Sequence, residues 1–154
     1  MAETTLDGIY NFLRLSDHLA TAGQPTEDEL AAIQDAGCQV IVNLLPASSP
    51  HALPDEDKIV TALGIDYVSI PVDWQQPEIA DIEQFFAVME ASGDKKVFVH
   101  CAANMRVSAF VYLYRTLHQQ MPPAEAEKDL HRIWEPNERW SRFIEDVTQH
   151  YAGH

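Results

Sequence analysis

Residues 97–115 read VFVHCAANMRVSAFVYLYR and contain a change from a strand pattern to a helix pattern. The apolar run 97–99 is short and does not alternate, which is typical of a strand covered on both faces in a parallel sheet. Residues 107–117 are apolar nearly all round, which is typical of a helix at the centre of a domain. The stretch therefore predicts a strand that leads into His100 and Cys101, a short loop, and a central helix.

Similar strand patterns and several helix patterns surround this stretch. Apolar runs at 40–45 and 67–72 predict two more buried strands. Thr26 and Glu29 form a capping box that predicts the start of a helix, which should end before Gly37. A crossover helix is predicted by one apolar stripe, Ile79, Ile82, Phe85, Phe86 and Met89. Two further helices close the chain, carrying Ala126, Leu130, Ile133 and Trp134, and then Trp140, Phe143, Ile144 and Val147.

Alternating strands and helices favour one α/β domain covering residues 1–154. We expect a central, mainly parallel sheet of four to five strands flanked by helices, with a helical C-terminal third. Parallel sheets bind ligands beyond the carboxyl ends of their strands. The loops that begin near Pro46, Asp73 and Cys101 should therefore converge on one ligand.

The composition excludes several classes of protein. The chain has 154 residues, 24 acidic against 10 basic, for a formal charge of −14, which argues against nucleic acid or anionic lipid as a partner. No segment has the pattern of a signal peptide or a membrane span, so we expect a cytoplasmic protein. Two cysteines are too few for a disulfide framework, and the histidines show no metal-ligand spacing. We expect neither a metal nor another cofactor.

The loop after Cys101 has the pattern of an anion-binding site. Backbone N–H groups of the loop and of the helix start can bind a dianion and favour a thiolate at Cys101. Arg106 adds a planar fork that can hold two phosphate oxygens through the transition state. The predicted phosphate-binding residues are Ala102, Ala103, Asn104, Met105 and Arg106.

Three further residues are candidates for supporting roles. Asp73 follows a predicted strand and is positioned to protonate a leaving oxygen, provided that Trp74 and a dry pocket keep the acid protonated. Ser108 is a candidate hydrogen-bond donor to the sulfur. The alternatives without a catalytic role are that Asp73 is an ordinary loop carboxylate and that Ser108 is a hydroxyl at a helix terminus. Cys38 has no such surroundings, and we interpret it as a small packed side chain.

The segments 22–46 (AGQPTEDELAAIQDAGCQVIVNLLP), 63–72 (LGIDYVSIPV) and 97–115 resemble a known superfamily. The chain looks like the cysteine-dependent protein tyrosine and dual-specificity phosphatases, and more closely like the phosphatase-like domain of bacterial beta-lactamase-hydrolase-like proteins. This resemblance implies a phosphotyrosine-phosphatase-like fold with Cys101 as nucleophile and Arg106 as phosphate ligand. It also implies that His100 tunes the thiolate and that Asp73 lies on the acid-bearing loop.

The loop departs from the usual phosphatase pattern in two ways. Four residues separate Cys101 from Arg106, whereas the usual loop has five; the bacterial proteins are similar in having four. The loop also has no glycine where the backbone needs positive φ. Asn104 is the best substitute, because asparagine tolerates the left-handed region.

Three functions are compatible with these residues. The first is a phosphatase acting on a phosphorylated small molecule or a phosphoprotein, with phosphotyrosine, phosphoserine, nucleotides and sugar or inositol phosphates all open. The second is a sulfurtransferase, because rhodanese-like enzymes resemble the loop in its short spacing. The third is a phosphate-binding pseudophosphatase or interaction module. The sequence leaves the oligomeric state open.

Overall fold

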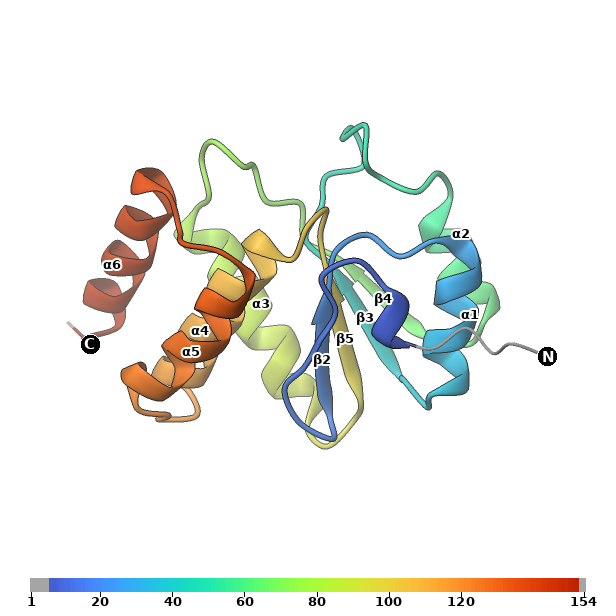
Figure 1. Cartoon of the computed structure of the whole chain (residues 1–154), viewed down its shortest axis with the longest axis horizontal. Helices are drawn as coiled ribbons and strands as arrows, with labels where there is room; N and C mark the ends of the chain where they lie inside the picture. Colours follow the sequence, from blue (N-terminus) through green and yellow to red (C-terminus); the bar gives the residue numbers. More distant parts are fainter. Residues whose placement is uncertain (1–5, 153–154) are drawn as a thin grey trace.

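The computed structural model describes residues 6–152, whose course is shown in Figure 1. A 3₁₀ helix, η1 (Leu6–Gly8), comes first. The strands are β1 (Leu13–Arg14), β2 (Leu19–Ala22), β3 (Val40–Asn43), β4 (Asp66–Ser69) and β5 (Val97–His100). The α-helices are α1 (Glu27–Asp35), α2 (Glu56–Ala62), α3 (Ile79–Ser92), α4 (Met105–Leu117), α5 (Pro123–Ile133) and α6 (Glu138–Ala152).

The strands of the described residues form one sheet in the order β1–β2–β5–β3–β4. β1 runs antiparallel to β2, and the other neighbours are parallel. This arrangement confirms the predicted sheet, which is mainly parallel. In the register, Asn43 lies opposite both Ser69 and His100, so β3, β4 and β5 end at the same level.

Helices cover both faces of the sheet (Figure 1). On one face, Leu30 of α1 and Val60 of α2 pack in one cluster with Ile41 of β3. On the other face, a larger cluster contains Phe85 of α3 and Trp140 of α6 together with residues of α4. The helix α5 packs along α4. As predicted, α4 is therefore enclosed by the sheet and by other helices.

The helix α1 begins and ends where the sequence predicts. The side chain of Thr26 accepts a hydrogen bond from the Glu29 amide at 3.2 Å, and the Glu29 carboxylate accepts one from the Thr26 amide at 2.9 Å. These reciprocal bonds satisfy two N–H groups that the first turn leaves unpaired. The chain leaves the helix through Gly37, whose φ of 90° suits glycine.

The short elements η1, β1, β2 and α2 were not assigned to particular residues from the sequence. β1 has only two residues, and β2 (LATA) has no apolar run, so neither gives a strand signal. The helix α2 has seven residues and follows Asp55, which has a left-handed backbone with φ of 60° and makes no side-chain cap. Such short elements depend on packing more than on their own sequence.

The loops that follow β3, β4 and β5 leave from one edge of the sheet, as predicted. Backbone pairing continues just beyond the strands, because the amide of Leu44 donates to His100 O at 2.9 Å. The amide of Val72 donates in turn to Leu44 O at 3.0 Å. The residues that follow, including Asp73 and Cys101, are therefore held at the same edge.

Candidate active site

The loop between β5 and α4 is tied to the end of β2. The Cys101 amide donates to Ala22 O at 3.4 Å, and the Gln24 amide donates to Ala102 O at 3.0 Å. Asn104 has φ of 65° and directly precedes the first residue of α4. The prediction that Asn104 takes the place of a glycine with positive φ is therefore confirmed.

The side chain of Asn104 helps to hold this loop in place. Its Nδ2 donates to Asn11 O at 2.9 Å and to Thr21 Oγ1 at 3.0 Å. In addition, Nδ2 of Asn11 donates to the neighbouring carbonyl, Ala103 O, at 3.0 Å. Two asparagine amides therefore fasten the loop to the segment before β1 and to β2. Asn104 is fully buried, which fixes the backbone around it.

The start of α4 presents backbone donors toward the loop. The first N–H groups of any α-helix have no intrahelical acceptor. In residues 6–152, the amides of Ala102, Met105 and Arg106 donate to no backbone carbonyl. Ala102, Met105 and Arg106 are partly exposed. Such N–H groups at a helix N-terminus are suited to binding an anion.

Gly23 packs against the loop without room for a side chain. A Cβ at this position would lie 2.5 Å from Ala102 O and 2.8 Å from Cδ2 of Tyr10. We expect Gly23→Ala to lower the free energy of unfolding by about 1–3 kcal/mol, because backbone atoms must move to admit the methyl group. Denaturant unfolding would measure this loss. Gly8→Ala is the matched control, since nothing lies within 4 Å of its Cβ, and a similar loss there would contradict the explanation.

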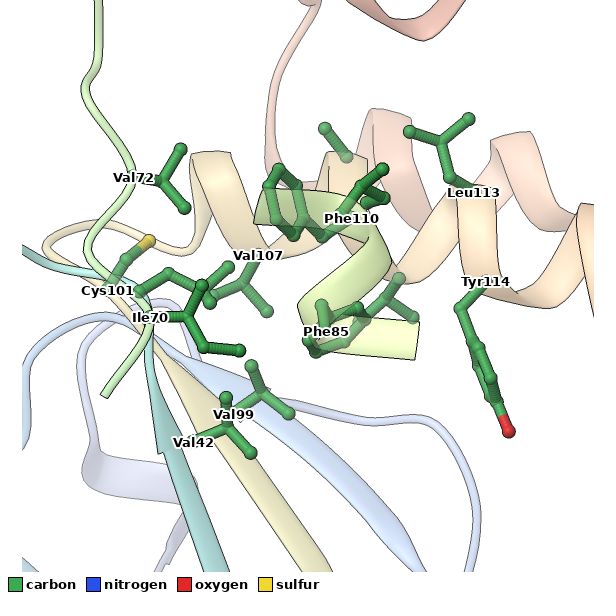
Figure 2. Close-up of a cluster of buried hydrophobic side chains, with 14 of the residues drawn as sticks. Val42, Ile70, Val72, Phe85, Val99, Cys101, Val107, Phe110, Leu113 and Tyr114 are labelled. Carbon is green, nitrogen blue, oxygen red and sulfur yellow. The ribbon is translucent and has the colours of Figure 1, made fainter. Parts of the chain in front are cut away.

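Cys101 lies at the floor of the loop and is fully buried, with 0% of its surface exposed. Figure 2 shows its sulfur on the side of the sheet where Ile70, Val72 and Val107 gather, and all belong to one buried cluster. The side chain of the preceding residue, His100, packs instead with α2, on the other face of the sheet, through Glu56. A ligand that reaches the sulfur must therefore approach from the loop edge.

Arg106 connects the loop of Cys101 with the loop of Asp73. Its Nε donates to Val72 O at 3.0 Å, and its Cζ lies 5.2 Å from the centre of the Trp74 ring. A guanidinium over an indole face is an attractive cation–π contact. The terminal nitrogens of Arg106 make no hydrogen bond to any residue in 6–152. They remain available to a ligand.

Trp74 anchors the loop that carries Asp73. Its ring lies 5.4 Å from that of Trp134 and 5.6 Å from that of Trp140, and Nε1 of Trp140 donates to Trp74 O at 3.0 Å. These contacts hold the Asp73 loop against Trp134 and Trp140 near the last two helices. Asp73 itself is exposed and accepts a hydrogen bond from the Gln75 amide at 2.8 Å. The dry surroundings expected for this carboxyl group concern the complex with a bound anion and stay a prediction.

A buried carboxylate behind the loop was not predicted. Glu56, the first residue of α2, is 4% exposed, and its Oε2 lies 2.8 Å from Nε2 of His100. Tyr67 OH and Asn43 Nδ2 donate to the same oxygen at 3.0 and 3.2 Å. Gln24 Nε2 donates to the other oxygen at 2.7 Å. An acidic residue in a polar loop gives no sequence signal of such burial.

The hydrogen bonds of Glu56 decide its ionisation. Burial raises the pKa of this carboxyl group, but the hydrogen bond and the charge of His100 oppose burial, as do the hydrogen bonds from Gln24 and Tyr67. The net result is a pKa below the ordinary value, so Glu56 is ionised at neutral pH. Burial, opposed by Asn43 and reinforced by Glu56, raises the pKa of Tyr67, which stays a neutral donor.

The hydrogen bonds of Ser108 and Cys38 show the surroundings of two other residues that the sequence analysis discussed. Ser108 Oγ donates to Met105 O at 2.8 Å and accepts from Nε1 of Trp134 at 3.0 Å. Its hydroxyl hydrogen is therefore directed at a helix carbonyl, and the predicted donation to the sulfur during hydrolysis of the intermediate stays a prediction. Burial raises the pKa of Cys38 to about 11, and its Sγ donates to Val40 O at 3.2 Å. Cys38 is thus an inert thiol, in line with its interpretation as a packed side chain.

Two other features are absent from residues 6–152. No group of three or more His, Cys, Asp and Glu side chains there is arranged to hold a metal ion. Among the helices in that range, none is both long and apolar enough to cross a bilayer.

Solved structures of other phosphatases share the fold of this chain, among them Tk-PTP and the kinase associated phosphatase KAP, each at 16% identity. The family itself is shown by a match to residues 13–142, whose description is "DSP-PTPase phosphatase fused to NAD+ Kinase". The match covers most of the chain, which therefore belongs to this family.

Individual relatives agree with this assignment. A protein assigned as a phosphatase (DUF442) from Shewanella putrefaciens CN-32 is 40% identical, with a TM-score of 0.85 over 95% of this chain and 96% of that one. TpbA of P. aeruginosa, solved in complex with pTyr, shares the fold at 16% identity and a TM-score of 0.71, over 94% of this chain and 91% of that one. The beta-lactamase hydrolase-like protein of Agrobacterium fabrum is 28% identical over 75% of this chain. The matched region is 27% of the length of that relative.

Proposed function

We propose that the chain hydrolyses phosphomonoesters through a cysteinyl-phosphate intermediate. The Cys101 thiolate attacks phosphorus, and the bond from phosphorus to the ester oxygen breaks while Asp73 gives that oxygen a proton. Water then attacks the phosphorus and gives a proton to the Asp73 carboxylate. The sulfur–phosphorus bond breaks, which releases inorganic phosphate and restores the thiolate.

The observation that carries this proposal is the position of Arg106 between two loops. Its Nε is bound to Val72 O, one residue before Asp73, while its backbone belongs to the first turn after the Cys101 loop. The terminal nitrogens and the loop amides can then hold the phosphate oxygens together. In such a complex, the phosphorus lies over Cys101 and the ester oxygen faces the Asp73 loop.

The loop of Cys101 is also preorganised for an anion. The left-handed Asn104 turns the chain so that α4 begins directly at the loop, and its side-chain bonds hold that turn. Donors that are fixed before the substrate binds need no reorganisation during the reaction. His100 and Ser108 support the loop from outside, through Glu56 and through Trp134.

A second candidate function is a phosphate-binding module without turnover. The complete burial of Cys101 and the exposure of Asp73 favour it, because a nucleophile and an acid both need contact with the substrate. In the proposed enzyme, the Asp73 loop closes over the bound ester. Activity assays therefore decide between the two functions.

The test is the release of phenolate from aryl phosphates and of alcohol from alkyl phosphates. We expect wild-type turnover of both and no transfer of sulfur from thiosulfate to cyanide. For Asp73→Asn, we expect kcat on alkyl phosphates to fall by about 10²–10⁴-fold, because the poor leaving group needs a proton. The fall in kcat on an aryl phosphate, which has a good leaving group, should be small.

A matched variant controls for the loss of one surface charge. Asp66→Asn changes an exposed aspartate on β4, whose nearest cation is Lys95 at 3.9 Å, and should leave both rates unchanged. Equal losses on both substrates for Asp73→Asn would show that Asp73 is not the acid. Sulfur transfer without phosphate release would replace the proposed function by the sulfurtransferase alternative.

A further inference from the structure

The residue that carries the inference is Glu56, whose carboxylate is buried beneath the Cys101 loop. Its oxygens accept hydrogen bonds from the segment before α1 and from β3, β4 and β5. The donors are Gln24, Asn43, Tyr67 and His100. An ionised group buried this deeply is costly unless its partners satisfy it. Here the donors come from three neighbouring strands and from the segment before α1.

The contact between Glu56 and His100 determines which nitrogen of the ring carries a proton. The ionised carboxylate can only accept, so Nε2 of His100 must be the donor at 2.8 Å. Nδ1 lies 3.4 Å from Cys101 O, which also can only accept. The ring satisfies both acceptors only when both nitrogens are protonated. Glu56 therefore favours a positively charged ring directly beside Cys101.

We propose that Glu56 is a positioning residue for Cys101, acting through His100. By holding the ring with both N–H groups directed at acceptors, it places a positive charge beside the backbone carbonyl of Cys101, and this charge stabilises the thiolate on the opposite face of the sheet through the field it exerts. The inference rests on the proposed function only in taking Cys101 as the nucleophile. Glu56 touches neither the sulfur nor the bound ester in this scheme.

Several charged or titratable groups surround Glu56, His100 and Cys101. His100 of β5 faces Glu56, and Tyr67 of β4 contributes a neutral hydroxyl. Asp57, also on α2, acts on Tyr67 through its charge. On the side of the Cys101 loop, the charged groups are Arg106 and, on the neighbouring loop, Asp73. Of these, only the ring of His100 contacts both Glu56 and the backbone of Cys101.

Two mechanisms predict opposite changes in the thiolate population when the charge of Glu56 is removed. A direct field effect would favour the thiolate, because a negative charge nearby has disappeared. If His100 transmits the effect, the thiolate instead loses its neighbouring cation. The direction of the change therefore identifies the mechanism.

The experiment measures the ultraviolet absorbance of the thiolate against pH in a Cys38→Ser background, where Cys101 is the single thiol. We expect Glu56→Gln to move the midpoint of this titration to higher pH, with about a tenfold smaller thiolate population on the rising part of the curve. An unchanged midpoint, or one at lower pH, would overturn the proposal. If Glu56→Gln does not fold, Glu56→Asp, which withdraws the carboxylate from Nε2, should move the midpoint in the same direction.

Two further variants separate this role from packing. Tyr67→Phe removes another donor to the same oxygen without touching His100 and should leave the midpoint unchanged. In a His100→Asn background, Glu56→Gln should cause no further rise, since the transmitting ring is absent. A shift with Tyr67→Phe equal to that of Glu56→Gln, or a full shift without His100, would refute the proposal. The titration needs no turnover, so an inactive wild type would refute the proposed function alone.

Discussion

Replacing Cys101 by serine is expected to abolish phosphate release, with a fall in kcat of about 10⁴-fold or more. A serine hydroxyl does not ionise near neutral pH, so the helix start and the loop amides cannot convert it into a nucleophile. The substitution removes no donor of the loop and adds no volume. Steady-state hydrolysis of an aryl phosphate measures the loss, and thermal unfolding with inorganic phosphate measures whether binding survives.

Cys38→Ser provides the matched control for Cys101→Ser. Cys38 lies before β3, where burial keeps its thiol protonated and Val40 O accepts its hydrogen. We expect full activity in that variant and stabilisation by phosphate in both variants. Appreciable turnover by Cys101→Ser would contradict the covalent mechanism. Loss of phosphate binding in Cys101→Ser would show that the loop of Cys101 needs the sulfur in order to bind phosphate.

The second large effect is expected for Arg106. Arg106→Ala removes the fork that holds the phosphate oxygens and the bond to Val72 O that joins the two loops. We expect kcat/KM to fall by about 10³-fold or more, because donors aimed at the charge of the transition state are lost. Arg106→Lys keeps the charge but not the planar fork, so we expect a loss of at least about tenfold.

Arg115 offers a comparison on the same helix. It is bound to Asp129 at 2.6 Å, far from the loop, and Arg115→Ala should change stability more than activity. Comparing kcat with KM distinguishes the roles of Arg106. A variant that changes KM alone would mean that Arg106 binds the substrate and its transition state equally. Wild-type activity in Arg106→Lys would contradict the bidentate contact.

Much of the fold is predictable because its signals are local. The capping box of Thr26 and Glu29 satisfies backbone donors within one turn, so it marks the start of α1 in any context. The apolar run before Cys101 and the apolar helix after it reflect burial on all sides. The strands β1 and β2 carry no such signal, because β2 is stabilised by pairing with β5 and β1 by pairing with β2.

The candidate site also combines features set by local sequence with features that depend on tertiary packing. Cys101, Arg106 and Asn104 lie within one short segment, and the roles proposed for them follow from the chemistry of that segment. The exposure of Asp73 and the hydrogen bond of Ser108 to Met105 depend on how neighbouring turns pack, which the sequence pattern does not reveal. The contact of Trp74 with Arg106 joins two loops that are distant in the sequence.

By itself, the sequence determined the order of the main strands and helices along the chain, the short loop between β5 and α4 and the residue that takes positive φ in it. These depend on hydrophobic periodicity, capping and backbone sterics, which act between neighbours along the chain. Only the tertiary structure decided that Glu56 lies under His100 and that Arg106 bonds to the Asp73 loop. Those contacts join segments that meet at one edge of the sheet, and a side chain far along the chain leaves no mark on the local pattern of its partner.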